Sequence, residues 1–355
     1  SGSWFLVEYL KGNAHIITGF IDYQIRLFKT EDSGHSGPFV YHFIVLLIGC
    51  FPASLIFIAS YFNDKELTPY QKQSRRIFMC LFWVVLILFS IVKTKIVHYS
   101  SLCYFPLTYI AAFGLVHNFQ NFRLATVNKV IYWLVASALS LGFIAIGFTK
   151  HLKNFLIQNN LIKDELAVQN LQAEVHWTGF EFIIGFIFFT SSLLIFIALN
   201  RKHLKLVLYG LILNIVFIWL SIVILVPKIE MYSQHAAIEF YKWCATKNCY
   251  VETHHFKSYA YLFYSNRKPE DYTNPDQIAY IENQLNIMEK EGHSRLSSYP
   301  TSNLFWMENG KIDRPAYIVV YKKNEDELIR KTGFIKMYEK NGFSFFVRMP
   351  EKPAK

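Results

Sequence analysis

Long apolar runs separated by short polar loops fill the first two thirds of the chain. A run of about 20 apolar residues is long enough to cross the hydrocarbon core of a bilayer as a helix. After residue 227 the pattern changes to short segments of alternating strand and helix periodicity. The sequence therefore predicts a mostly α fold, a polytopic bundle of about six transmembrane helices followed by a small soluble α/β domain. The six expected spans are approximately 39–62, 77–92, 100–116, 130–148, 180–199 and 206–226.

Three regions follow from this pattern: a loop segment at 1–38, the bundle at 39–227 and the α/β domain at 228–355. Within the bundle, residues 149–178 form an amphipathic connector, which is typical of short helices at a membrane interface. It either covers the bundle or contributes to substrate access. In the α/β domain we expect strands at 250–254 and 316–321, a hairpin of 334–339 with 343–349 turning at Asn341-Gly342, and helices at 235–245, 258–264, 276–290 and 325–331.

Composition supports a membrane protein, with 53% hydrophobic residues and a mean hydropathy of +0.22. The net charge is +10, but the basic residues form no stripe interleaved with exposed aromatic residues. We therefore expect no nucleic-acid partner. The loops 63–76, 117–129 and 200–205 hold nine Lys or Arg in 33 residues, against eight in 75 for the opposite loops. By the positive-inside rule these basic loops are cytoplasmic. The connector, the 93–99 loop and the C-terminal domain then lie on the outer face, the periplasm in a bacterium.

The five cysteines divide into two groups. Three lie in apolar runs and read as small buried hydrophobes. Cys244 and Cys249 lie in the soluble domain, where they either form a disulfide or remain two thiols.

The charged stretch Lys93-Thr-Lys-Ile-Val-His-Tyr99 stands at the boundary between two spans. Charges at such a boundary either snorkel to the interface as anchors or hold a ligand. Other polar residues fall on the same face, and lysine, arginine and histidine there suit a phosphate or a metal ion. They include Asp22, Arg26, Lys29 and His35, and the turn formed by Gly34, Gly37 and Pro38 allows close backbone approach to a ligand.

The soluble domain shows no known catalytic motif such as GxSxG, a P-loop or GxGxxG. It does contain His254-His255 near Glu252. Because neighbouring side chains of a strand point to opposite faces, we expect no metal site there.

Three segments carry a resemblance to a known family. These are Arg26-Leu-Phe28, Gly34-His-Ser-Gly-Pro38 and the Lys93–Tyr99 motif followed by Tyr104-Phe-Pro106. In order, spacing and sidedness they resemble the second half of bacterial GT-C membrane glycosyltransferases. That family contains the 4-amino-4-deoxy-L-arabinose lipid A transferase and is related to the protein O-mannosyltransferases.

The resemblance implies transfer of a sugar from a polyprenyl-phosphate donor to lipid A, another glycan or a protein at the outer face of the inner membrane. It places Lys93, Lys95, His98, Tyr99 and Arg26 at the donor-phosphate site. The turn of Gly34, His35, Gly37 and Pro38 would form the cavity wall. Its expected partners are the donor, membrane lipids, the acceptor and an N-terminal half.

The chain departs from the family pattern in ways that affect the chemistry. Tyr23 stands where a metal-ligating histidine is expected, which leaves Asp22 as a candidate ligand for Mg, Mn or Zn. Val97 replaces a proline before His98-Tyr99. The family's catalytic aspartate belongs to a loop with no counterpart in this sequence, so we expect this chain alone not to turn over.

Without the family resemblance, two other interpretations are compatible with the sequence. One is a non-catalytic membrane subunit with a periplasmic interaction domain. The other is part of a transporter, since intramembrane charges also mark transport paths. The charges here gather at one face, and Asn214 is the one strongly polar side chain well inside the last span, which disfavours the transporter.

Overall fold

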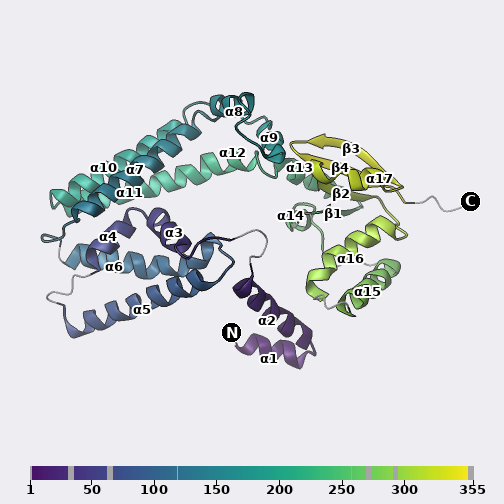
Figure 1. The fold of residues 1–355 in the computed structure, drawn as a ribbon, viewed down its shortest axis with the longest axis horizontal. Helices are drawn as coiled ribbons and strands as arrows, with labels where there is room; N and C mark the ends of the chain where they lie inside the picture. Colours follow the sequence, from purple (N-terminus) through teal and green to yellow (C-terminus); the bar gives the residue numbers. More distant parts are fainter. Residues whose placement is uncertain are drawn as a thin grey trace, which may run out of the picture. The chain divides into compact units, whose positions relative to one another are not determined.

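The computed structural model describes residues 2–30, 36–61, 67–117, 119–256, 258–268, 274–290 and 295–350, with the backbone alone at 295–301. The chain divides into two compact units (Figure 1). The membrane unit comprises Ser1–Phe148 and Thr178–Ile222, and the C-terminal unit comprises Thr149–Trp177 and Val223–Lys355. The predicted fold class, a helical bundle followed by a small α/β domain, is confirmed.

The membrane unit is entirely helical within the part that the structure describes. Five helices there are long and apolar enough to cross a membrane, and a sixth crossing results if one bent helix pair counts as a span. The elements are α1 (Gly2–Leu10), α2 (Ala14–Lys29), α3 (Tyr41–Gly49), α4 (Ala53–Ser60), α5 (Pro69–Ile91), the 3-10 helix η1 (Val97–Cys103), α6 (Tyr104–His117), α7 (Thr126–Ile146), α10 (Phe182–Asn200) and α11 (Leu204–Leu220). A π-helical turn, η2 (Ser221–Leu225), and α12 (Val226–Glu230) prolong α11 into the C-terminal unit.

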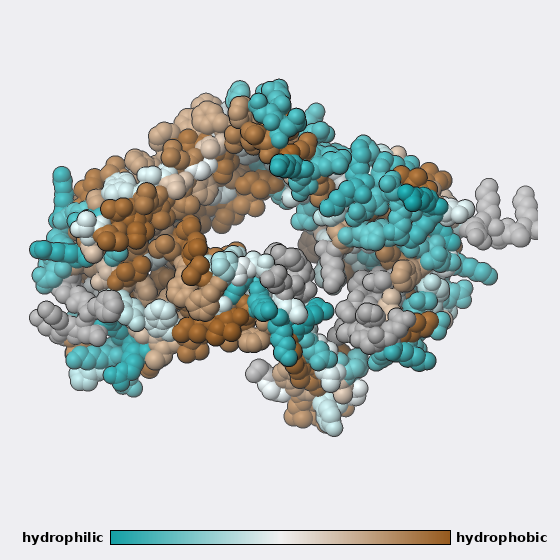
Figure 2. Space-filling model, viewed as in Figure 1, coloured by the Kyte–Doolittle hydropathy of each residue, from teal (hydrophilic) through white to brown (hydrophobic). Residues whose placement is uncertain are grey.

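On the face shown in Figure 2, much of the surface of the membrane unit is apolar. Leu134 of α7 and Ile215 of α11 are each 65% exposed, and Val84 of α5 is 64% exposed. Water would penalise this arrangement, whereas lipid tails solvate it without cost. The exposed aliphatic side chains therefore mark the lipid-facing surface of a multi-pass protein.

The first expected span is not one straight helix. Helices α3 and α4 meet at an angle of 109°. Proline has no amide hydrogen to donate and its ring blocks the preceding helical turn, so Pro52 ends α3 and begins α4. The sequence predicted one continuous run, because hydropathy does not register such a bend.

The bent pair nevertheless runs from one end of α5 to the other. Before α3, the Cα of Gly37 lies so close to Lys95 that an added Cβ would be 3.2 Å from the Cγ of Lys95, just beyond the end of α5. After α4, the guanidinium of Arg75, near the start of α5, donates to the carbonyls of Ser60 (2.9 Å) and Tyr61. Those carbonyls lie at the C-terminal end of α4, so Arg75 caps the helix. These contacts hold the two ends of the bent pair, which makes a sixth crossing if it counts as one span.

Helices α4 and α6 approach each other closely through a glycine. A Cβ on Gly114 would come within 2.3 Å of the Cβ and Oγ of Ser60. Small residues at such crossings allow the dispersion contacts that hold helices together in lipid. Gly142 of α7, by contrast, faces open space.

We predict opposite effects for the same substitution at these two glycines. Gly114→Ala should lower the unfolding free energy by about 1–3 kcal/mol, because the added methyl group overpacks the α4–α6 contact. Gly142→Ala should be neutral or stabilise by up to about 1 kcal/mol, since alanine favours helix. Thermal unfolding in detergent compares the two variants, and equal unfolding temperatures would contradict the close approach.

The C-terminal unit is built on a four-stranded sheet in the order β1-β2-β4-β3. Strands β1 and β2 are parallel, and the other two pairs are antiparallel. The strands are β1 (Tyr250–His254), β2 (Ala316–Tyr321), β3 (Phe334–Lys340) and β4 (Phe343–Arg348). The helices are α8 (Thr149–Gln158), α9 (Glu165–Leu171), α13 (His235–Cys244), α14 (Ala260–Tyr264), α15 (Pro275–Lys290), α16 (Arg295–Asn309) and α17 (Asp326–Arg330), with the 3-10 turn η4 (Lys322–Asn324).

Helices cover both faces of this sheet. Val251, Val319 and Phe345 pack with α13 and α14 on one face. Ile318 and Phe346 pack with α15, α16 and α17 on the other. Successive residues of β2 and β4 point to opposite faces of the sheet, so each strand contributes side chains to both hydrophobic cores.

The strands and most helices of this unit match the sequence prediction. The hairpin turns at Asn341 and Gly342 as expected, with φ of 48° and 81°, the left-handed values that a tight two-residue hairpin requires. Helix α16 was not predicted, because its Ser-, Asn- and Tyr-rich segment lacks a clear apolar stripe. Its buried Trp306 and Met307 show that tertiary packing forms the helix.

Most of the connector 149–178 belongs to the C-terminal unit and makes contacts within it. The indole of Trp177 donates to the Tyr232 hydroxyl at 2.8 Å. Leu166 of α9 lies against Gly342, where an added Cβ would be 2.7 Å from its Cδ1. The apolar side of the connector, which suggested a membrane-interface helix, is therefore partly used within the soluble domain.

Candidate functional site

The motif Lys93–Tyr99 is the link between α5, which ends at Ile91, and the 3-10 helix η1, which begins at Val97. A helix end leaves carbonyl groups without amide partners. The motif supplies a donor for those carbonyls, and it also attaches the end of α2. Its two lysines have different surroundings.

Lys95 turns inward and is 4% exposed. Its ammonium donates to the carbonyls of Phe89 (3.1 Å), Ser90 (2.7 Å) and Val92 (2.6 Å). Burial lowers the pKa of this ammonium, while three carbonyl dipoles at a helix C-terminus favour its positive charge. In this conformation Lys95 is the cap of α5 and has its three donors occupied.

Lys93 turns outward and is exposed, while its backbone holds α2. The Lys93 amide donates to the Phe28 carbonyl at 3.2 Å, and the Thr94 amide donates to the Leu27 carbonyl at 3.3 Å. The Thr94 hydroxyl adds a bond to the Thr30 carbonyl at 2.8 Å. The Arg26-Leu-Phe28 segment and the lysine motif, distant in sequence, are thus joined by hydrogen bonds.

Arg26 immediately precedes this junction on α2 and is exposed. Its guanidinium lies over the Tyr23 ring, 5.1 Å from the centroid, a cation–π arrangement. Tyr23, which replaces the histidine expected from the family pattern, therefore packs against the Arg26 guanidinium.

Asp22 is exposed on the same helix. Among the described residues, no group of three His, Cys, Asp or Glu ligand atoms includes it. The described residues thus do not assemble a metal site at Asp22, and its assignment as a ligand stays a prediction.

The glycine-rich turn packs against the motif. Gly37 contacts the aliphatic stem of Lys95 and the Tyr41 ring so closely that a Cβ would lie 3.2 Å from each. Pro38 follows and accepts from the Tyr41 amide at 2.9 Å. The other two predicted wall residues, Gly34 and His35, lie outside the described residues.

Behind the motif lies a polar and aromatic layer that sequence reasoning did not single out. His42 of α3 is fully buried, and its Nδ1 lies 3.2 Å from the Ser100 hydroxyl. The Tyr99 ring packs against Phe89 at 5.2 Å and against His98 at the same distance. A histidine within an otherwise apolar run was the available signal for His42.

The structure therefore brings together Arg26, Gly37, Pro38, Lys93 and Lys95 at one end of the bundle. His98 and Tyr99 continue the same segment, with His98 exposed and Tyr99 half-buried. Exposed cations fixed at a membrane boundary, beside a glycine that permits close approach, are suited to hold a phosphate group.

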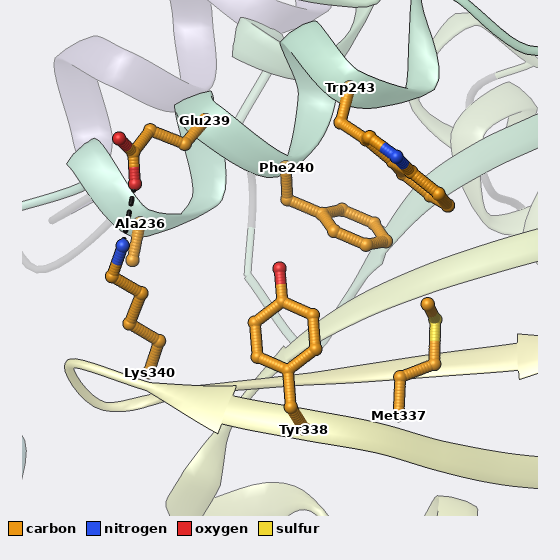
Figure 3. A pocket seen from close by; sticks show the side chains of 7 residues that line it. All are labelled: Ala236, Glu239, Phe240, Trp243, Met337, Tyr338 and Lys340. Atoms are coloured by element: carbon orange, nitrogen blue, oxygen red, sulfur yellow. Dashed lines mark hydrogen bonds and ion pairs between the residues drawn. The ribbon is translucent and has the colours of Figure 1, made fainter.

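The C-terminal unit has a concavity of its own, between α13 and β3 (Figure 3). Its volume is about 260 Å³. The rings of Phe240 and Tyr338 face each other across it, 6.2 Å apart, and Lys340 pairs with Glu239 at 2.7 Å at one edge. The lining comprises Ala236, Glu239, Phe240, Trp243, Met337, Tyr338 and Lys340.

The two cysteines of this unit are free, buried thiols. The Arg267 guanidinium donates to the Cys249 sulfur at 2.9 Å and to the Cys244 carbonyl at 3.1 Å. Of the two alternatives left open by the sequence, the structure contains the thiol form.

A buried carboxyl group lies at the centre of the C-terminal unit. Glu252 is 2% exposed and accepts from the Tyr261 hydroxyl (2.8 Å) and the Asn303 amide (3.0 Å). Burial outweighs these hydrogen bonds and raises the pKa of Glu252 to about 7.

We predict that this carboxyl makes the C-terminal unit less stable as pH rises. A group whose pKa rises on folding, here from 4.5 to about 7, stabilises fully below its unfolded pKa and loses that contribution as pH passes its folded pKa. The loss is about 3 kcal/mol between pH 4.5 and 8. Unfolding of the full-length protein across this range should show it, and Glu252→Gln should remove it. An unchanged pH slope in Glu252→Gln would contradict the assignment.

Comparison with known proteins agrees with the motifs. No protein-family model matches the sequence. The chain is 32% identical over 125 residues to the undecaprenyl phosphate-alpha-4-amino-4-deoxy-L-arabinose arabinosyl transferase of Wigglesworthia glossinidia brevipalpis, covering 34% of this chain and 21% of that protein. The protein of the same name from Pectobacterium carotovorum subsp. carotovorum is 30% identical over 132 residues, covering 35% of this chain and 22% of that protein.

Solved structures show the same likeness in fold. ArnT from Cupriavidus metallidurans bound to undecaprenyl phosphate superposes with a TM-score of 0.57 at 11% identity, over 97% of this chain and 57% of that chain. The apo state of the same protein superposes with a TM-score of 0.55 at 11% identity, over 96% of this chain and 57% of that chain. The expected resemblance is confirmed, and the chain has an ArnT-like GT-C fold. It spans about a fifth of the curated relatives and little more than half of the solved chains.

Proposed function

We propose that this chain contributes the donor-phosphate side of a membrane glycosyltransferase, which moves a sugar from a polyprenyl-phosphate donor to lipid A or another acceptor. The observation that carries the proposal is the junction of α2, the Gly37-Pro38 turn and the Lys93–Tyr99 motif at one end of the bundle. The names of the relatives supply the donor class, an undecaprenyl-phosphate aminosugar.

The site is proposed to face the periplasm, with the bundle in the inner membrane. Helices α5, α6, α7 and α10 alternate direction through loops whose basic residues gather at one end. By the positive-inside rule, this supports the proposal that the Lys93–Tyr99 loop, the connector and the residues after 230 lie at the opposite end, whichever way α3 and α4 are counted. A donor carried by a polyprenyl chain would reach such a site from the bilayer.

Each residue has a distinct role in this proposal. Lys93 binds the phosphate directly, and Arg26 adds a second cation with bidentate geometry. As the sugar–phosphate bond breaks, negative charge develops on the departing phosphate, and these cations stabilise it. Lys95 is a positioning residue, because it holds the end of α5 in the form that presents Lys93.

The remaining residues shape the space around the phosphate. Tyr99 and His98 form one wall of the cavity, and Gly37 and Pro38 form another where the backbone comes close to the ligand. The acceptor's activating base is not assigned within this chain.

The direct test is transfer of labelled sugar from an undecaprenyl-phosphate donor by the full-length protein, reconstituted in liposomes with lipid A. Product dependent on both donor and acceptor is the expected result. A folded protein that gives no product with lipid A, glycan or protein acceptors would contradict the proposal and favour a non-catalytic subunit.

A further inference from the structure

We propose that His254, His255 and Glu327 form a binding site for a divalent transition-metal ion, with Zn²⁺ as the best fit. The site lies wholly within the C-terminal unit. It is independent of the phosphate site and of the candidate ligand Asp22.

The backbone after β1 makes this site, against the expectation from strand alternation. Strand β1 ends at His254, and His255 adopts a φ of +60°. This left-handed conformation is uncommon for a residue with a side chain and costs about 1–2 kcal/mol. Its consequence is that both imidazoles turn to the same side, with ring centroids 4.0 Å apart.

The ligand atoms converge on one carboxylate oxygen. Oε2 of Glu327 lies 3.2 Å from His254 Nε2 and 2.5 Å from His255 Nε2. All three ligand atoms lie within 4.8 Å of one another. Zn–N and Zn–O bonds of about 2.0–2.1 Å place tetrahedral ligands roughly 3.3 Å apart. The Glu327–His254 distance of 3.2 Å already matches this spacing, and the Glu327–His255 distance of 2.5 Å must lengthen by roughly 0.8 Å.

A buried carboxylate supports the inner histidine. Oε1 of Glu308, whose side chain is 2% exposed, lies 3.3 Å from the Nδ1 of His254. Metal-bound histidines almost always present their second ring nitrogen to a carboxylate, carbonyl or water, which fixes the tautomer that leaves Nε2 free for the ion. Among the described residues neither atom has a hydrogen-bond partner, so both are available for that arrangement.

Lys331 fixes the two carboxylates without blocking the ligand atom. Its ammonium lies 2.7 Å from Glu308 Oε2 and 3.0 Å from Glu327 Oε1. Because Lys331 pairs with Oε1 of Glu327, the other oxygen, Oε2, remains directed toward the two histidines. With neutral imidazoles, two carboxylates and one ammonium give a local charge of −1, which favours a cation.

The site has an open position. The side chains of His255 and Glu327 are 50% and 46% exposed, whereas that of His254 is 5% exposed. Catalytic zinc sites likewise have three protein ligands and a fourth position open to water or substrate. A bound ion would connect the end of β1 to α17.

Co²⁺ titration of the full-length protein in detergent, followed by visible absorption and by competition with Zn²⁺, tests the site. We expect one ion per chain with a tetrahedral spectrum. Asparagine tolerates the left-handed conformation, so His255→Asn keeps the backbone and should weaken binding at least tenfold. Glu327→Gln should do the same. Zn²⁺ should also raise the unfolding temperature of the wild type and not of His255→Asn.

A histidine outside the proposed site provides the matched control. His235 lies 3.0 Å from Glu230 and 3.4 Å from Glu239, also in the C-terminal unit. Among the described residues, its ion-pair partners are these two carboxylates, with no imidazole beside them. His235→Asn should leave Co²⁺ affinity unchanged. Equal affinity and spectrum in wild type and His255→Asn, or loss of binding in His235→Asn, would overturn the proposal.

Discussion

Lys93→Ala should lower the rate of sugar transfer by the full-length protein about 100- to 1,000-fold while leaving its unfolding temperature unchanged. The rate falls because a cation that stabilises the departing phosphate is removed. Stability is kept because the Lys93 side chain is exposed and its structural contact, the hydrogen bond to Phe28, uses the backbone amide. Initial rates at saturating donor and thermal unfolding in the same detergent measure the two effects.

Two control variants test whether the loss of rate comes from the positive charge at this position. Lys93→Arg keeps the positive charge and should recover part of the activity. Lys205→Ala removes an exposed lysine at the basic loops and should leave the rate within about twofold of wild type. Full activity in Lys93→Ala would refute the phosphate assignment.

Lys95→Met should act first on stability. The substitution keeps the aliphatic stem but leaves the carbonyls of Phe89, Ser90 and Val92 without their ammonium donor. A buried polar group without a partner costs about 1–3 kcal/mol, so we expect a loss of about 3 kcal/mol or more. Transfer should fall with it, because the end of α5 no longer holds Lys93 in place. Unfolding by heat and the KM for donor measure the two consequences.

The alternative for Lys95 gives a different pattern. If this lysine bound phosphate directly, Lys95→Met would lose activity with little change in the unfolding temperature. That result would show that the ammonium leaves the helix end in the working protein, and the positioning role would be wrong.

Much of the fold was predictable because local rules agree with the tertiary structure. Apolar runs gave the membrane helices, and the β-branched and aromatic strand at 316–321 lies at the centre of both soluble cores. The Asn341-Gly342 pair predicted the hairpin turn, since both residues tolerate positive φ. The junction of α2 with the Lys93–Tyr99 motif was expected only through the family resemblance.

Other features depend on contacts that no sequence window contains. The opposite directions of Lys93 and Lys95 follow from where α5 ends, because only Lys95 reaches the last carbonyls. The connector's place with the C-terminal unit depends on Trp177 meeting Tyr232. His255 escapes strand alternation because its φ is positive just after the strand ends.

Binding of undecaprenyl phosphate to the full-length protein tests the central claim most directly, because it requires no acceptor and no turnover. Native mass spectrometry or a competition assay in detergent would compare wild type, Lys93→Ala and Lys205→Ala. The account predicts binding at least tenfold weaker in Lys93→Ala and unchanged in Lys205→Ala. Equal binding by wild type and Lys93→Ala would contradict it.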